Sequence, residues 1–149
     1  MTLKQKIHQH YSRLVQDKID VFRDMIAALT ADSKNDAKGS AGDKHETALS
    51  MMHIEQEKLN RKLQEFLDQK AILEKINCNQ NSSRIVVGSL VQANGMWLFV
   101  ATALPKIAIE DKTIIAVSPQ SPLGSHLLGK EVGFTFQINE TQYLVEIVT

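Results

Sequence analysis

Apolar residues recur at alternating steps of about three and four along the first part of the chain. An α-helix turns about every 3.6 residues, so these steps place the apolar side chains on one helix face, which we call a seam. The pattern predicts a helix over about residues 3 to 30, with Lys18 as the one polar residue in the seam. The apolar seam residues are Leu3, Ile7, Tyr11, Leu14, Val21, Met25 and Ala28.

A second seam runs through Leu49, Met52, Leu59, Leu63, Phe66, Leu73 and Ile76. No proline or glycine lies between Asp43 and Val87, so we expect a helix of roughly 33 residues here. The interval at 31–43 contains two glycines and no periodic apolar residue, which predicts a turn. Neither helix can bury its seam alone. We therefore expect residues 1–77 to form an antiparallel coiled-coil hairpin with its tip at about 31–43.

The rest of the chain shows β signals after a polar linker at 78–83. Asn94-Gly95 is a strong hairpin signal because both residues tolerate positive φ. Ser121-Pro122 predicts the capped start of one short helix, and Gly129 its end. Residues 84–149 therefore predict a small α+β domain. Its expected strands are 86–93, 96–103, 106–109, 113–117, 133–138 and 142–148.

The composition of the chain mainly excludes classes of function. The chain of 149 residues has 17 basic and 17 acidic side chains, and independent nucleic-acid binding needs a basic excess, so we expect no independent sequence-specific nucleic-acid binding. No run approaches the roughly 18 apolar residues of a membrane span, and charged residues follow the N-terminus closely. Cys78 is the one cysteine, so it has no disulfide partner within the chain. These features predict a cytoplasmic protein with no membrane partner.

Catalytic motifs are scarce, and one pair of carboxylates stands out. Asp43 and Glu46 lie three residues apart where the turn enters the second helix. They can form a capping box that satisfies the first backbone N–H groups of the helix. They can also offer hard oxygen ligands to a divalent cation. The two roles are compatible, and the spacing alone leaves both open. We expect Cys78, His8 and His10 to have no catalytic or metal-binding role.

A distinctive run of residues lies near the C-terminus: Ser118-Pro119-Gln120-Ser121-Pro122-Leu123-Gly124, followed by Leu127-Leu128-Gly129-Lys130 and Val132-Gly133. In this run the chain resembles the Gre family of bacterial transcript-cleavage factors. The resemblance implies an FKBP-like C-terminal domain that docks on RNA polymerase, with Ser121, Pro122, Leu123, Gly124 and Lys130 as partner-binding residues. A prolyl isomerase would need an aromatic-lined pocket, whereas Trp97, Phe99, Phe134, Phe136 and Tyr143 are most simply explained as core residues.

The resemblance also assigns the tip a role. In the family an Asp-x-x-Glu pair followed by Asn acts at the polymerase active centre, and here Asp43 and Glu46 reproduce the spacing, with Thr47 next. A second alignment, anchored on Gly39, places Ser40 and Asp43 at those positions instead. The first alignment implies that the pair helps to hold a Mg²⁺ ion of the polymerase during cleavage of backtracked RNA. The protein would then have no cofactor of its own, would not itself be an enzyme, and would contact nascent RNA only indirectly. In the family the coiled coil runs down the secondary channel of the polymerase to reach that centre. The alternative is a non-catalytic coiled-coil protein that occupies this channel and modulates transcription without stimulating cleavage.

Overall fold

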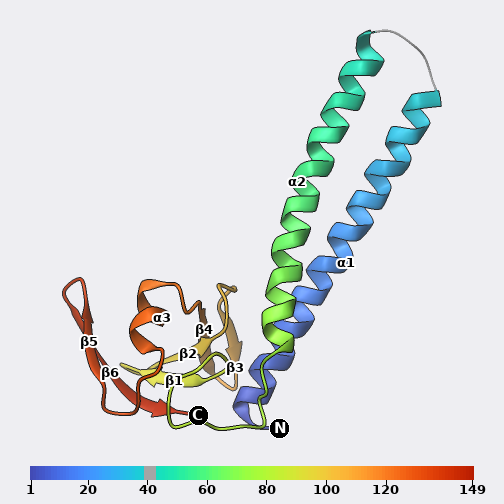
Figure 1. Ribbon diagram of the computed structural model, residues 1–149. Helices are drawn as coiled ribbons and strands as arrows, with labels where there is room; N and C mark the ends of the chain where they lie inside the picture. Colours follow the sequence, from blue (N-terminus) through green and yellow to red (C-terminus); the bar gives the residue numbers. More distant parts are fainter. Residues whose placement is uncertain (39–42) are drawn as a thin grey trace. The chain divides into compact units, whose positions relative to one another are not determined.

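The computed structural model describes the backbone of residues 1–38 and 43–149, and the side chains of 1–32 and 47–149. The chain divides into two compact units. One, here called the sheet unit, combines Met1–Ser12 with Ala71–Thr149. The other, here called the hairpin unit, is Arg13–Lys70. The fold is therefore α+β, as expected, with two helices followed by a six-stranded mixed sheet (Figure 1).

The two helices are α1, Leu3–Lys38, and α2, Asp43–Glu74. The predicted end of the first helix near residue 30 was wrong. The sequence Ala-Asp-Ser-Lys-Asn-Asp-Ala-Lys that follows Thr30 contains neither glycine nor proline, so each residue weakens the helix only slightly and none breaks it. Among the helices that the structure describes, none is long and apolar enough to cross a membrane.

Within the hairpin unit, the buried face of α1 differs from the predicted seam. Val15 and Ile19 are buried there, whereas Val21 and Met25 are 54% and 44% exposed. The predicted track had to pass through Lys18, while the observed one, Val15, Ile19, Phe22 and Ile26, stays apolar. On α2 the predicted seam residues within this unit, Leu49, Met52, Leu59, Leu63 and Phe66, are buried or half-buried, whereas Leu73 and Ile76 belong to the sheet unit.

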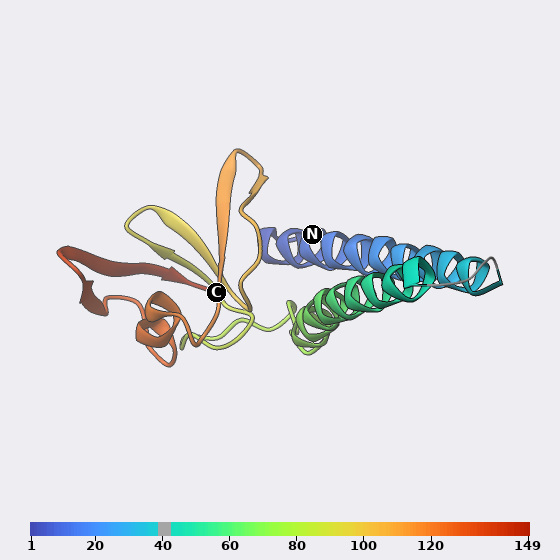
Figure 2. The same cartoon turned by 90° about the horizontal axis from the view of Figure 1, so that it is seen from above.

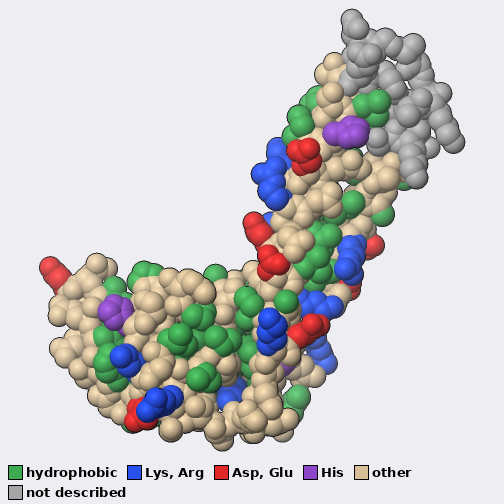
Figure 3. Space-filling view, viewed as in Figure 1, with side chains coloured by type: hydrophobic (Ala, Val, Ile, Leu, Met, Phe, Trp, Pro, Cys, Tyr) green, Lys and Arg blue, Asp and Glu red, His purple; other side chains and the backbone are tan. Residues whose placement is uncertain are grey.

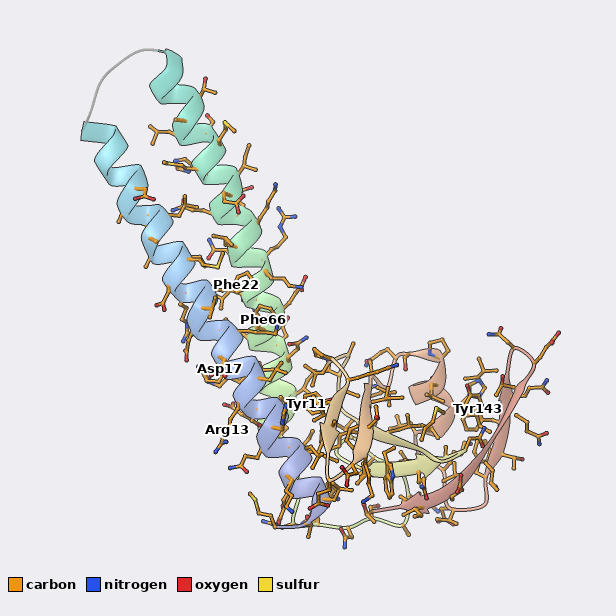
Figure 4. The ribbon with its side chains drawn as sticks, turned by 180° about the vertical axis from the view of Figure 1, so that it is seen from behind. Tyr11, Arg13, Asp17, Phe22, Phe66 and Tyr143 are labelled. Carbon is orange, nitrogen blue, oxygen red and sulfur yellow. The ribbon has the colours of Figure 1, made fainter. Side chains whose placement is uncertain are left out.

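The helices run side by side in opposite directions, as Figures 1 and 2 show. Phe22 and Phe66 meet edge to face, with ring centroids 5.1 Å apart (Figure 4). Farther along, the Gln56 side-chain amide donates a hydrogen bond of 2.9 Å to the Thr30 hydroxyl. Lysines and arginines alternate with acidic residues on the outer faces of the helices (Figure 3), which is typical of solvated helix surfaces.

The sheet has the strand order β3-β4-β2-β1-β6-β5. All its pairs are antiparallel except β2 with β4, which is parallel. Asn94 and Gly95 form the predicted hairpin turn with φ values of 51° and 76°. The strands are β1 (Leu90–Ala93), β2 (Met96–Val100), β3 (Ile107–Ile109), β4 (Lys112–Val117), β5 (Thr135–Ile138) and β6 (Thr141–Val148).

The first strand starts later than the predicted residue 86 because a turn precedes it. The Ser89 N–H donates to the carbonyl of Val86, and the Val86 N–H donates to the Ser89 hydroxyl. Gly88 within this turn has a φ of 100°, and a Cβ there would lie 2.8 Å from Ile76. The turn thus needs glycine both for its positive φ and for the close approach of Ile76.

The core of the sheet unit lies between the sheet and α3, Pro122–Leu127. It includes the fully buried Val91, Leu98 and Leu127, together with Ile85 from the preceding loop. The first turns of α1 belong to the same unit, and Ile7 and Tyr11 are completely buried there. The sequence did not predict this dual role of α1, because its apolar residues were all assigned to the helix–helix seam.

Candidate functional site

The turn between β4 and α3 is built around Ser121. Its hydroxyl oxygen accepts a hydrogen bond from the Gly124 N–H at 3.0 Å and its hydroxyl donates to the Ser118 carbonyl at 2.7 Å. Pro122 follows at the first helical position, where its missing N–H costs nothing. The predicted N-cap is therefore confirmed.

Gly124 is buried where α3 crosses the chain just before it. A Cβ at this position would collide with the Ser118 carbonyl oxygen and lie 3.1 Å from the Cα of Pro119. Leu123 packs against the sheet-unit core. Ser121, Leu123 and Gly124, all expected to bind a partner, thus make internal contacts that hold α3 in place.

The end of α3 is fixed by Ile85. The Gly129 N–H donates to the Ile85 carbonyl at 2.7 Å, and the Ile85 N–H donates to the Lys130 carbonyl at 2.8 Å. Gly129 has a φ of 81° just after the last helical turn, as predicted for a helix stop. These bonds place Lys130 on the surface beside β5, where its side chain is exposed.

Beside Lys130 lies a cluster that we call the aromatic row: His126, Phe134, Phe136 and Tyr143. The Lys130 ammonium lies 4.8 Å from the centroid of the Phe134 ring. Phe136 stacks with Tyr143, its partner in the β5–β6 register, at 5.0 Å between centroids. The rings of His126 and Phe136 are also stacked, with centroids 5.1 Å apart.

The aromatic row was only partly foreseen. Phe136, at 8% exposed, and Phe99, at 0%, are core residues as predicted, but Trp97, Phe134 and Tyr143 are only half-buried. The alternation of Phe134 and Phe136 in the expected strand 133–138 could have suggested that these rings share one face, although β5 itself begins at Thr135. Two apolar residues close in sequence to the row are exposed as well: Leu128 by 42% and Val132 by 59%.

Cation–π contact and exposed apolar groups together suit docking of a macromolecule better than chemistry on a small substrate. Pro122 and Lys130 are the exposed members of the set expected to bind a partner. The candidate partner-binding site is therefore the surface of α3 and Lys130 together with the exposed or half-buried rings of the row, His126, Phe134 and Tyr143, which rest on the buried Phe136.

For the tip carboxylates, Asp43 and Glu46, the structure describes the backbone alone. Asp43 is the first residue of α2, so Asp43 and Glu46 both belong to its opening turn. Their side chains lie outside the described residues, as do residues 39–42 of the expected tip.

The other titratable residues considered from the sequence, His8 and Cys78, contact neighbouring parts of the sheet unit. The His8 ring nitrogen Nε2 lies 2.6 Å from the carbonyl oxygen of Leu73. Burial raises the pKa of the Cys78 thiol, and the nearby Lys4 ammonium opposes this rise. Over the part of the chain whose side chains are described, no group of three or more His, Cys, Asp or Glu residues could hold a metal ion.

No protein-family model matches this chain, and no curated protein matches it.

Proposed function

We propose that this protein is a Gre-type transcription elongation factor that binds bacterial RNA polymerase. In this proposal the hairpin is a coiled coil that enters the secondary channel of the polymerase, and the sheet unit is an FKBP-like domain that docks at the rim of the channel. The protein stimulates the polymerase's own cleavage of backtracked RNA and is not itself an enzyme.

The spacing of seam residues supports the coiled coil. On α1 the spacings are four, three and four residues along the series Val15, Ile19, Phe22 and Ile26. On α2 the spacings likewise alternate between four and three residues along the series Met52, Gln56, Leu59, Leu63 and Phe66. This is the alternation of a and d positions in a heptad repeat. The Phe22–Phe66 contact joins the two series.

Helix length supports the reach that the proposal requires. From Lys70 back to Asp43, α2 is continuous and extends about 40 Å at about 1.5 Å per residue. The observation that carries the proposal is this: a carboxylate pair with the family's spacing begins the second arm of a long helical hairpin. Carboxylates at such an end can approach a metal centre that a compact domain cannot enter.

In this mechanism Asp43 and Glu46 help to retain the second Mg²⁺ ion of the polymerase and to orient the attacking water. Two-metal hydrolysis stabilises both the attacking and the leaving oxygen, and the polymerase supplies the other ligands. The protein therefore needs no cofactor of its own, and its contact with nascent RNA is indirect.

Docking is assigned to the sheet unit. Lys130 and Pro122 offer exposed groups to the polymerase, while Ser121, Leu123 and Gly124 hold α3 in the geometry that presents them. Lys130 beside Phe134 provides a cation backed by an apolar ring, a combination enriched at protein interfaces.

The identity of one residue favours an alternative function. Thr47 follows Glu46 where cleavage-stimulating members of the family carry asparagine. In the alternative, the protein occupies the secondary channel and modulates transcription without stimulating cleavage.

A cleavage assay on stalled elongation complexes tests the proposal. Complexes of a bacterial polymerase with end-labelled, backtracked RNA are incubated with the full-length protein, and shortened transcripts are measured over time. Faster cleavage than with polymerase alone is expected. Binding to the polymerase without faster cleavage would favour the alternative, and absence of binding to the polymerase of the protein's own organism would overturn both.

A further inference from the structure

The sheet unit contains a cavity of about 660 Å³ that none of the proposed polymerase contacts uses. Its volume lies within the range of small-molecule sites, about 300 to 1,000 Å³. The wall combines two lysines with side-chain amides and hydroxyls, and it includes no aspartate or glutamate. It is formed by Lys4, Lys75, Asn77, Gln80, Asn81, Ser82, Val86, Val87, Gly88, Ser89 and Thr149.

Lys4 is the most unusual residue of this wall. It is only 6% exposed, although lysine is almost never buried without a partner. Its ammonium donates a hydrogen bond of 2.7 Å to the carbonyl oxygen of Gln80, and it forms no ion pair with any residue whose side chain is described. Burial lowers the pKa of Lys4, as expected for a cation without a carboxylate beside it.

The other polar groups of the wall add hydrogen-bond donors. The Asn77 side-chain carbonyl accepts from the Asn79 N–H, and the Ser82 hydroxyl oxygen accepts from the Arg84 N–H. Because these bonds use the oxygens, the Asn77 amide N–H groups and the Ser82 O–H stay available as donors. Lys75 contributes an exposed ammonium that is likewise in no ion pair with the described side chains.

We propose that this cavity binds a small molecule that bears a phosphate group. A phosphate has several acceptor oxygens pointing in different directions, which suits two point-charge ammonium groups and neutral donors spread around a wall. Lysine binds phosphate as a point charge without a fixed geometry, and the wall contains no arginine whose planar fork would favour a bidentate anion. The volume exceeds that of a lone phosphate, so the rest of the ligand also lies in the cavity. The proposal is independent of polymerase binding.

Calorimetric titration of the full-length protein with inorganic pyrophosphate, without divalent cations, tests the proposal. Saturable binding is expected for the wild type. Lys4→Gln and Lys75→Gln should each weaken it about tenfold, since hydrogen bonds to charged groups contribute about 1.5 to 3 kcal/mol. Lys106→Gln is the matched control because it removes one positive charge outside the wall, and it should change affinity less than about twofold.

Three results would overturn the proposal: no saturable binding by the wild type, equal weakening by Lys106→Gln, or equally tight binding of succinate, a dicarboxylate. Trp97 fluorescence and thermal unfolding check that each variant is folded. If Lys4→Gln does not fold, the exposed Lys75→Gln variant decides, and unchanged affinity in that variant would contradict the proposal.

Discussion

The rings of Tyr11 in α1 and Phe99 in β2 lie almost parallel, with centroids 6.1 Å apart and planes inclined by 11°. Both side chains are completely buried. The Tyr11 hydroxyl donates a hydrogen bond of 2.7 Å to the carbonyl of Pro105, in the loop that follows β2. The start of α1 is thus a structural part of the sheet unit, held by one apolar and one polar contact from a single side chain.

Tyr11→Ala should lower the free energy of unfolding of the sheet unit by about 3 to 5 kcal/mol, because it removes a buried ring and leaves a cavity. Tyr11→Phe keeps the ring contact and loses the hydrogen bond, so it should cost only about 0.5 to 1.5 kcal/mol. Urea unfolding followed by Trp97 fluorescence measures both. Equal losses in the two variants would contradict the assigned importance of ring packing.

Alkaline pH should destabilise the protein through the same residue. Burial raises the pKa of Tyr11 from 10.0 to about 12. The folded state therefore holds the phenol proton more tightly than the unfolded state, and this contribution is complete below pH 10.0 and is lost as pH rises towards about 12. Burial lowers the pKa of Lys4, so the ionisation of Lys4 changes the stability with pH in the opposite direction.

A comparison of wild type with Tyr11→Phe isolates the tyrosine, since Lys4 is present in both. The difference in their unfolding free energies should be constant below pH 10.0 and should change in favour of the variant above it. A difference that does not vary with pH would show that Tyr11 ionises in the folded protein as it does in the unfolded chain.

Gly124→Ala should destabilise the sheet unit strongly, by about 2 kcal/mol or more, because the new methyl group collides with backbone at Ser118 and no flexible side chain can move away. Gly129→Ala is the matched control. It has open space around it and only the cost of a positive φ, about 1 kcal/mol. Thermal or urea unfolding ranks the two, and a larger loss in Gly129→Ala would refute the packing argument.

Local signals predicted the elements of the sheet unit well. Asn94-Gly95 and Ser121-Pro122 succeed because their turn and cap depend on neighbouring residues only. The burial of Tyr11 against Phe99 was not predictable in this way, since it joins residues far apart in the sequence and uses the same apolar periodicity that a helix–helix seam would show.

The two wrong predictions for α1, its buried face and its C-terminal end, have different physical causes. Leu14 and Val15 are adjacent apolar residues, so periodicity alone allows two seams, and the folded protein buries the one through Val15 and Ile19. The helix continues to Lys38 because weak helix formers do not end a helix that is already nucleated. For the candidate site, the resemblance proposed Lys130 and Pro122 as binding residues and their exposure is compatible with that, but the stacking of His126 on Phe136 depends on α3 and β5 lying side by side, which local sequence does not predict.

Lys130→Glu should weaken binding to RNA polymerase about tenfold, because it reverses a charge at the proposed docking surface. Lys106→Glu makes the same charge change outside that surface and is the control. Biolayer interferometry with immobilised polymerase measures both affinities. If the two variants bind alike, the docking surface is not the one beside α3.

Asp43→Asn combined with Glu46→Gln should abolish stimulated RNA cleavage and leave polymerase binding nearly unchanged. The substitutions remove two charges but keep size and most hydrogen-bonding capacity, so the start of α2 should lose only about 1 kcal/mol. Loss of cation ligation removes several kcal/mol of charge stabilisation from the hydrolytic transition state, which corresponds to a rate loss of about a hundredfold or more. The stalled-complex assay and a binding measurement, made on the same protein samples, separate the two effects. If the double variant accelerates cleavage as the wild type does, the pair has a capping role alone. The test is sharp because removal of the two charges should change the cleavage rate greatly and the stability of the helix only slightly.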